Sequence, residues 1–190
     1  MLAISLFFGI RWWSMRPISH PPGIIAPTPP IQKNISSPKP FRHLDYTITP
    51  LADFEVSARV LSREDYYIDA SAELSPTDLA LGWGRMSDEA VISQLEIEQS
   101  VRFYTWRTRR FPIPREEISA SSANMHIIPA DENVKDQLKN VRVGHIVDFE
   151  GYLVKIHRQH DGFRWQSSLT RTDTGAGACE VIWVKSLRYR

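Results

Sequence analysis

The chain has little cysteine and almost no net charge. Its 190 residues include one cysteine, Cys179, which excludes a disulfide within the chain and a zinc site built from several cysteines. The net charge of +1, from 23 basic and 22 acidic side chains, gives no overall field that would attract nucleic acid or anionic lipid. Hydrophobic residues make up 42% and aromatic residues 11% of the chain. This content is enough for a sizeable core.

The chain also lacks an apolar run long enough to cross a bilayer. Residues 1–10 form an apolar run about half the length that a spanning helix needs, and Trp12 and Trp13 follow it, as in an interfacial aromatic belt. No basic region precedes the run and no small-residue cleavage site follows it, so a cleaved signal peptide is not predicted. We interpret residues 1–16 as the last part of an uncleaved membrane anchor, truncated at its start. An apolar N-terminus that docks on the folded domain is the alternative.

Proline is concentrated near the N-terminus. Eight of the 13 prolines lie between Pro17 and Pro40, which is typical of a stiff linker. We expect an anchor at 1–16, a proline-rich linker at 17–50 and one domain at 51–190. The basic residues after the apolar run favour a cytoplasmic domain, whereas a proline-rich stalk commonly holds a domain away from an envelope membrane. We therefore expect the cell (inner) membrane, with the domain on the periplasmic or extracytoplasmic side.

The remaining sequence is rich in strand patterns. Alternating apolar and polar residues predict strands, and His160-Asp161-Gly162 predicts a hairpin turn. Capping signals predict three short helices. The pattern indicates a mainly β (α+β) fold: a small, antiparallel, partly open β-barrel of the OB-like or SH3-like type. The expected strands are 54–60, 66–70, 100–108, 123–128, 145–157, 163–170 and 180–189, and the expected helices are 75–82, 87–95 and 131–140.

One candidate site is a thiol nucleophile. A reactive cysteine needs an imidazole, and often a cation that stabilises the oxyanion. His126, Cys179 and Arg188 occur in the chain order found in sortases, and the arrangement resembles those membrane-anchored β-barrel transpeptidases in order and spacing only. Here, however, Cys179 follows a Gly-rich stretch and leads into a strand. The alternative interpretation of Cys179 is a small buried residue at the start of a strand.

The segment before Cys179 has two other interpretations. Asp173-Thr-Gly-Ala176 resembles the active-site loop of retroviral-type aspartic proteases, but only fifteen residues follow Gly175. Gly175-Ala-Gly177 could form an anion-binding loop of backbone amides, although the strand that follows favours an ordinary turn. Arg171 and Asp173 are therefore ligand-binding candidates in this segment.

A third candidate site is the segment from Arg102 to Arg115, in which five arginines alternate with aromatic residues. Arginine neutralises phosphates and aromatic rings stack on bases, so the segment could bind single-stranded nucleic acid. Acidic residues flank it, and a solvated strand edge is the simpler interpretation, so nucleic acid is not the expected partner. Arg102, Trp106 and Trp83 are candidate ligand-binding residues, although both tryptophans could equally line the core.

Three strings, at 74–88, 122–130 and 172–180, resemble those of an uncharacterised group of bacterial hypothetical proteins that carry an N-terminal membrane segment. The resemblance covers most of 54–184. It implies a bacterial, membrane-tethered protein and assigns neither an activity nor a catalytic residue.

We therefore expect a non-enzymatic binding or accessory module of the bacterial envelope, held by its N-terminal segment and contacting a protein or cell-wall partner. A cysteine transpeptidase or hydrolase is the first alternative, and a single-stranded nucleic-acid binder is the second. No metal site is expected, because no carboxylate lies at ligand spacing from the histidines, and no cofactor is expected.

Overall fold

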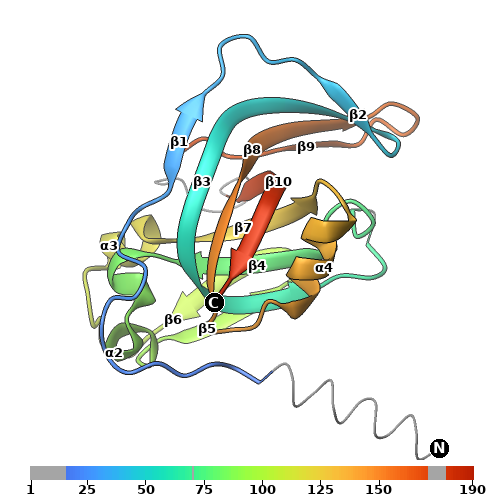
Figure 1. Cartoon of the computed structure of the whole chain (residues 1–190). Helices are drawn as coiled ribbons and strands as arrows, with labels where there is room; N and C mark the ends of the chain where they lie inside the picture. The colour runs from blue at the N-terminus through green and yellow to red at the C-terminus, as the bar shows by residue number, and fades with distance from the viewer. Residues whose placement is uncertain (1–15, 70, 171–178) are drawn as a thin grey trace, which may run out of the picture.

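The computed structural model describes residues 16–69, 71–170 and 179–190 and is mainly β (Figure 1). The strands are β1 (Ile31–Asn34), β2 (Phe41–His43), β3 (Tyr46–Asp65), β4 (Thr77–Gly82), β5 (Glu96–Ser100), β6 (Phe103–Arg107), β7 (Ser122–Pro129), β8 (Ile146–Arg158), β9 (Arg164–Gln166) and β10 (Glu180–Tyr189). The helices are the 3-10 helix η1 (Gly84–Ser87), α2 (Glu89–Ile92), α3 (Arg115–Ala120) and α4 (Glu132–Asn140).

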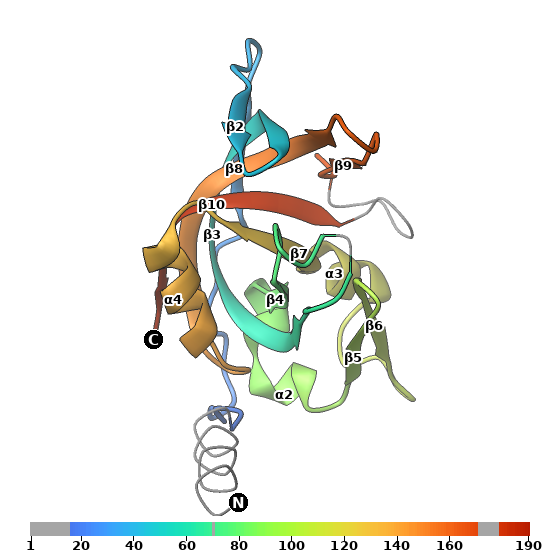
Figure 2. The same cartoon turned by 90° about the vertical axis from the view of Figure 1, so that its right-hand side faces the viewer.

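Five strands form a closed ring of hydrogen bonds. β3 pairs with β4, β4 with β7, β7 with β10, β10 with β8, and β8 pairs again with β3. The β7–β10 pair is parallel, and the other four pairs of the ring are antiparallel, as expected of a mostly antiparallel sheet. β5 and β6 form a separate two-stranded hairpin. Figure 2 shows this hairpin and α3 together on one side of the ring.

The length and curvature of β3 make the ring possible. Tyr46 to Arg59 pair with β8, and Arg59 to Asp65 pair with β4. Register shifts after Pro50 and after Val60 interrupt these ladders, and such bulges bend a strand and increase its twist. β3 therefore pairs first with β8 and then with β4, and it curves around the core (Figure 1).

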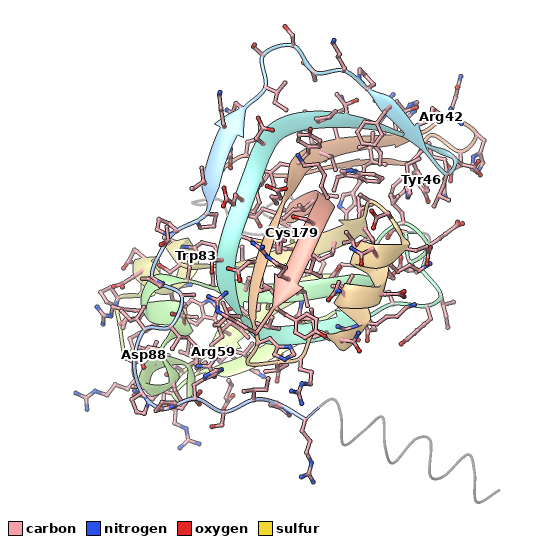
Figure 3. The ribbon with its side chains drawn as sticks, in the orientation of Figure 1. Arg42, Tyr46, Arg59, Trp83, Asp88 and Cys179 are labelled. Carbon is pink, nitrogen blue, oxygen red and sulfur yellow. The ribbon has the colours of Figure 1, made fainter. Side chains whose placement is uncertain are left out.

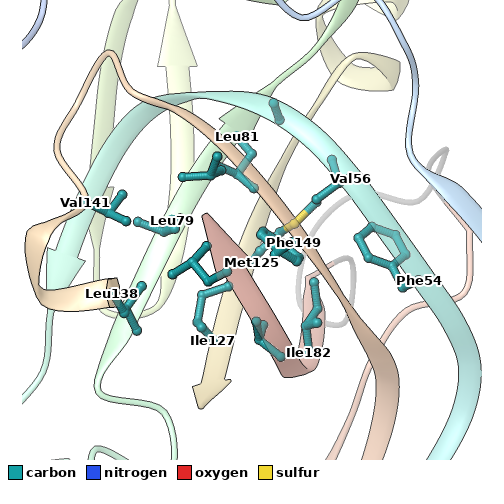
Figure 4. Packing of buried hydrophobic residues seen from close by; sticks show 14 of the residues in the cluster. Phe54, Val56, Leu79, Leu81, Met125, Ile127, Leu138, Val141, Phe149 and Ile182 are labelled. Carbon is teal, nitrogen blue, oxygen red and sulfur yellow. The ribbon is translucent and has the colours of Figure 1, made fainter. Parts of the chain in front are cut away.

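The ring encloses the main hydrophobic core, part of which is shown in Figure 4. α4 covers one end, where Val134 and Leu138 join this core. Asp131 caps the helix by accepting a hydrogen bond from the Val134 amide at 2.8 Å, so the helix predicted at 131–140 is confirmed. Core side chains of the central strands include Leu79, Leu81, Met125, Ile127, Phe149 and Ile182.

Two smaller clusters cover the outer face of β4, β7 and β10. Ile128 and Val181 belong to one of them, together with Tyr46 and Leu74. Ala80 belongs to the other, which packs beneath the β5–β6 hairpin and α3. Polar side chains lie between the two clusters on the same face, and they form the candidate site described below.

The segment interpreted as a linker, 17–50, contacts the domain along its length. The Ile18 amide donates to the Val143 carbonyl at 2.8 Å, and the amide of the fully buried Ala26 donates to Ser87 Oγ at 3.0 Å. β1 and β2 both pair with β3. This part of the chain therefore contributes strands to the sheet and is not a free stalk.

Three of the predicted elements differ from the structure. Most of the helix predicted at 75–82 is a strand, β4 (Thr77–Gly82), whose six residues are all buried, because contacts on both faces outweigh the helix-capping pattern of Ser75-Pro76. The described residues 66–69 of the strand predicted at 66–70 form no strand, and they lie in the connection between β3 and β4. The strand predicted at 100–108 is interrupted by a turn at Val101-Arg102 between β5 and β6.

Within the part of the chain that the structure describes, no helix is long and apolar enough to cross a membrane. The predicted anchor at 1–16 lies outside the described residues except for Arg16.

Candidate functional site

The strand register aligns polar residues in two rows on the outer face of β4, β7 and β10. Met125 and Ile127 point into the main core, so Asn124 and His126 point outward, because strand side chains alternate. Asp78 is opposite His126 on β4, and Val181 is opposite His126 on β10. Extending the register by one residue places Cys179 beside Asn124.

Asp78 and His126 form a buried pair. The Asp78 side chain is fully buried and the His126 side chain is 3% exposed. Nδ1 of His126 lies 2.9 Å from Oδ2 of Asp78, although the two atoms are not aligned well enough for a hydrogen bond. The ring of Trp165 lies against the imidazole, with 4.6 Å between ring centroids. The imidazole is therefore positioned between a carboxylate and an indole.

Arg102 connects the β5–β6 hairpin to this pair. Its guanidinium donates to Asp78 Oδ1 at 2.9 Å and to Asp69 Oδ2 at 2.8 Å, and it lies 3.7 Å from the centroid of the Tyr66 ring. The Arg102 amide donates to the Tyr66 hydroxyl at 2.9 Å. Two carboxylates thus balance one guanidinium, and one of them is completely buried.

The backbone that carries Arg102 is strained. Val101 and Arg102 have φ values of 51° and 67°, the left-handed conformation that a two-residue hairpin turn requires at both central positions. Glycine and asparagine adopt this conformation readily, whereas a β-branched residue such as Val101 does so at a cost. The contacts of Arg102 therefore hold the turn in place.

Cys179 is half-buried and in no disulfide, and it lies just before β10 (Figure 3). Its thiol donates to the Arg102 carbonyl at 3.9 Å, and Nδ2 of Asn124 lies 4.0 Å from the sulfur. The same Asn124 amide donates to the Arg102 carbonyl at 2.9 Å. Cys179, Asn124 and the turn at Arg102 therefore meet at one point.

These residues surround a cavity of about 290 Å³. His126 and Cys179 line it together with Arg102, and the aromatic rings of Phe103, Phe163 and Trp165 form much of its wall. Of the residues that the structure describes, Ser71, Arg164 and Gln166 also line it. We call this cavity the outer pocket. Aromatic rings form its wall, and the polar side chains of His126, Cys179 and Arg102 form its floor.

Two of the three predicted catalytic residues meet in the outer pocket. His126 and Cys179 both line it, but Arg188 lies near the far end of β10, about 30 Å along the strand from Cys179 at the usual rise per residue. There it faces Asp148 in the strand register and lines a separate hollow with Glu55 and Glu150. Among the described residues, Arg102 and Arg164 are the arginines that line the outer pocket with the cysteine and the histidine.

The other candidate residues are divided among different environments. Trp83 is 3% exposed and belongs to the main core (Figure 3), and Trp106 packs against the cluster beneath the hairpin. Arg107, in the arginine-rich segment, pairs with Glu98 at 2.8 Å. Arg171 and Asp173 lie outside the described residues, as do the glycines at 175 and 177.

Asp78, Asn124 and Trp165 were not predicted as site residues. Asp78 was assigned to a helix, which concealed its position opposite His126. The spacing of Asn124 and His126, two residues apart in a predicted strand, was the available signal that they share a face. Among the described residues, no group of three or more His, Cys, Asp or Glu side chains is arranged to hold a metal ion.

Two tyrosines beside the pocket resist ionisation. Burial raises the pKa of Tyr104 to about 12, and burial together with the charge of Asp78 raises the pKa of Tyr66 to about 12. Unfolded tyrosines ionise near pH 10. The unfolded chain therefore loses these protons first as the pH rises.

We expect the free energy of unfolding to fall between about pH 10 and pH 12, where the unfolded state binds fewer protons than the folded state. Tyr104→Phe removes one of the two groups and should reduce this slope. Urea unfolding at several alkaline pH values measures it. Equal slopes for Tyr104→Phe and the unaltered chain would contradict the assignment.

Comparison of the chain with protein-family models, with curated proteins and with solved structures found no match.

Proposed function

We propose that this chain is a tethered accessory module of the bacterial envelope that binds its ligand in the outer pocket. The observation that supports the proposal most directly is the combination of a buried Asp78–His126 pair at the floor with aromatic side chains in the wall. Pockets that recognise small groups are mostly apolar, with a few fixed polar groups. We further propose that the ring of strands is a small, partly open β-barrel of the OB-like or SH3-like type.

The charges in the pocket indicate what it would bind. Asp69 and Asp78 pair with Arg102, and Arg164 also lines the pocket, so these four side chains together carry no excess of either sign. An aromatic or apolar group could stack on Trp165 and Phe103, with a polar end directed to His126. A side chain of a protein partner or a cell-wall component could present such a group. Nucleic acid is not the ligand that we propose for the pocket.

The position of the N-terminal segment is compatible with a tether. The first described residues lie at the opposite end of the molecule from β9, which lines the pocket (Figures 1 and 2). A chain anchored through residues 1–16 could therefore hold the pocket away from the membrane. The cell membrane and its extracytoplasmic side remain the proposed location, consistent with the bacterial family that the sequence resembles.

The binding proposal is tested by titrating the full chain with indole, phenylacetamide and benzamidine while recording ¹H–¹⁵N NMR spectra. At least one fragment should shift the Trp165 indole signal and the amides of Cys179 and Phe103. Trp165→Ala should abolish these shifts. Phe111→Ala, which removes a ring that is 51% exposed and outside the pocket, is the matched control and should leave them unchanged. Fragments that shift no pocket residue would refute the proposal.

A further inference from the structure

We propose that the outer pocket also performs a covalent step, in which Cys179 takes an acyl group from an ester or thioester of an arylacetic acid. His126 would act as the general base and Asp78 would position the imidazole. The inference rests on the proposed function, because the pocket must first bind the acyl group. It differs from the arrangement predicted from the sequence, since Asp78 completes the set and Arg188 has no part in it.

The sheet places the thiol and the imidazole on the same face and in the same cavity. His126 faces Val181 across the parallel β7–β10 pair, and Cys179 is two residues before Val181, so both side chains lie on the outer face. Residues related in this diagonal way are about 7–8 Å apart at the backbone, so the imidazole must lean toward Cys179, and the thiol toward His126, for the two groups to meet. Both residues line the same cavity.

The orientation of the imidazole favours this role. Nδ1 is the nitrogen nearest to Asp78, 2.9 Å from its Oδ2, and Asp78 is on β4, one neighbour of β7, whereas Cys179 precedes β10, the neighbour on the opposite side. Nε2 is therefore the nitrogen directed away from Asp78, toward the side where the thiol lies. A carboxylate at Nδ1 and a nucleophile at Nε2 is the arrangement that activates a thiol or hydroxyl in carboxylate–histidine–nucleophile sites.

The acyl transfer to Cys179 and the hydrolysis of the resulting thioester need water as their only co-reactant. The thiol now donates to the Arg102 carbonyl, and rotation about its Cα–Cβ bond turns it to the imidazole. Nε2 of His126 accepts the thiol proton while Sγ attacks the acyl carbon. The bond to the leaving alcohol or thiol then breaks, and the imidazolium protonates that group. Water, deprotonated by His126, cleaves the resulting thioester to a carboxylic acid and restores the thiol.

The surroundings of the sulfur suit an acyl substrate. Nδ2 of Asn124 lies 4.0 Å from Sγ and can donate to an oxyanion formed beside the sulfur. Trp165, Phe163 and Phe103 provide a wall against which an aryl group can pack. An arylacetyl group has the required aromatic ring one carbon away from the reacting carbonyl.

The test uses the full chain and p-nitrophenyl phenylacetate. We expect a burst of p-nitrophenolate and an intact-mass increase of one phenylacetyl group, located at Cys179 by peptide mapping. Cys179→Ser should abolish the thioester adduct. His126→Gln should slow acylation by about 100-fold, a typical contribution of a general base. Arg188→Gln, the matched control for the arrangement predicted from the sequence, should acylate at the unaltered rate.

Asp78→Asn distinguishes positioning from a structural role. It should shift the pH at which the acylation rate is half-maximal, because it removes the negative charge beside the imidazole, whereas simple loss of folded protein would lower the rate equally at every pH. A folded, unaltered chain that forms no adduct at Cys179 while phenylacetamide still binds the pocket would overturn this inference and leave the binding proposal standing. Absence of both adduct and binding would overturn both.

Discussion

Arg102→Met is expected to lower the free energy of unfolding by about 3–5 kcal/mol, the usual cost of leaving one member of a buried ion pair without its partner. Asp78 has a fully buried side chain, and the Arg102 side chain is 16% exposed. Removing the guanidinium would leave the Asp78 carboxylate with only the misaligned His126 beside it. It would also remove the side-chain contacts to Asp69 and Asp78 that help to hold the strained turn at Val101.

Urea unfolding of the full chain measures this loss. Arg107→Met is the matched control, because it removes an arginine from the same hairpin whose side chain is 66% exposed and whose partner Glu98 is 62% exposed. Exposed pairs of this kind contribute at most about 1 kcal/mol. Combining Arg102→Met with Asp78→Asn should recover part of the stability, because the unpaired charge is removed. Equal losses for Arg102→Met and Arg107→Met would contradict the description of the pocket floor.

Gly151→Ala should lower the free energy of unfolding by about 3 kcal/mol, at the upper end of the usual cost of overpacking. Gly151 lies in β8, and a Cβ added there would be 1.9 Å from the Trp183 carbonyl oxygen of β10. The clash is with the backbone of the neighbouring strand, so no side-chain rotation can relieve it. The strands would have to separate where the ring is closed.

Gly162→Ala is the control for the second prediction. Gly162 has a φ of 73° and no atom within 4 Å of an added Cβ, so alanine there should cost only the conformational penalty of about 1–2 kcal/mol. Thermal or urea unfolding compares the two variants. If Gly151→Ala proved as stable as Gly162→Ala, the close approach of β8 and β10 would be wrong.

Much of the strand content could be predicted from local patterns, because half-buried strands alternate visibly. Residues 54–60 lie within β3, and the hairpin of β8 and β9 occurs at the predicted turn. The hairpin of β5 and β6 was missed because Val101-Arg102 has no glycine or asparagine to mark its turn. The contacts that hold this turn come from Tyr66, Asp69 and Asp78, residues distant in the sequence.

The candidate site was only partly predictable. Cys179 and His126 stand out as chemically versatile residues in any sequence, but the choice of a third residue depended on spatial proximity. Arg188 satisfied the expected order along the chain and lies at the wrong end of β10. Asp78 and Trp165 reach His126 only through strand pairing and the folding of β9 over the sheet, and neither is apparent from spacing along the chain.

Local residue patterns alone were enough to establish a β-rich domain, the capped helix at 131–140 and the strand that begins at Glu180, because short-range periodicity and capping chemistry specify these elements. Long-range contacts determined the closure of the ring through β3 and β8, the parallel pairing of β7 with β10, and the strand conformation of β4. The physical reason is burial. A strand covered on both faces loses its alternating pattern, and the energy that selects its conformation comes from neighbours far away in the chain.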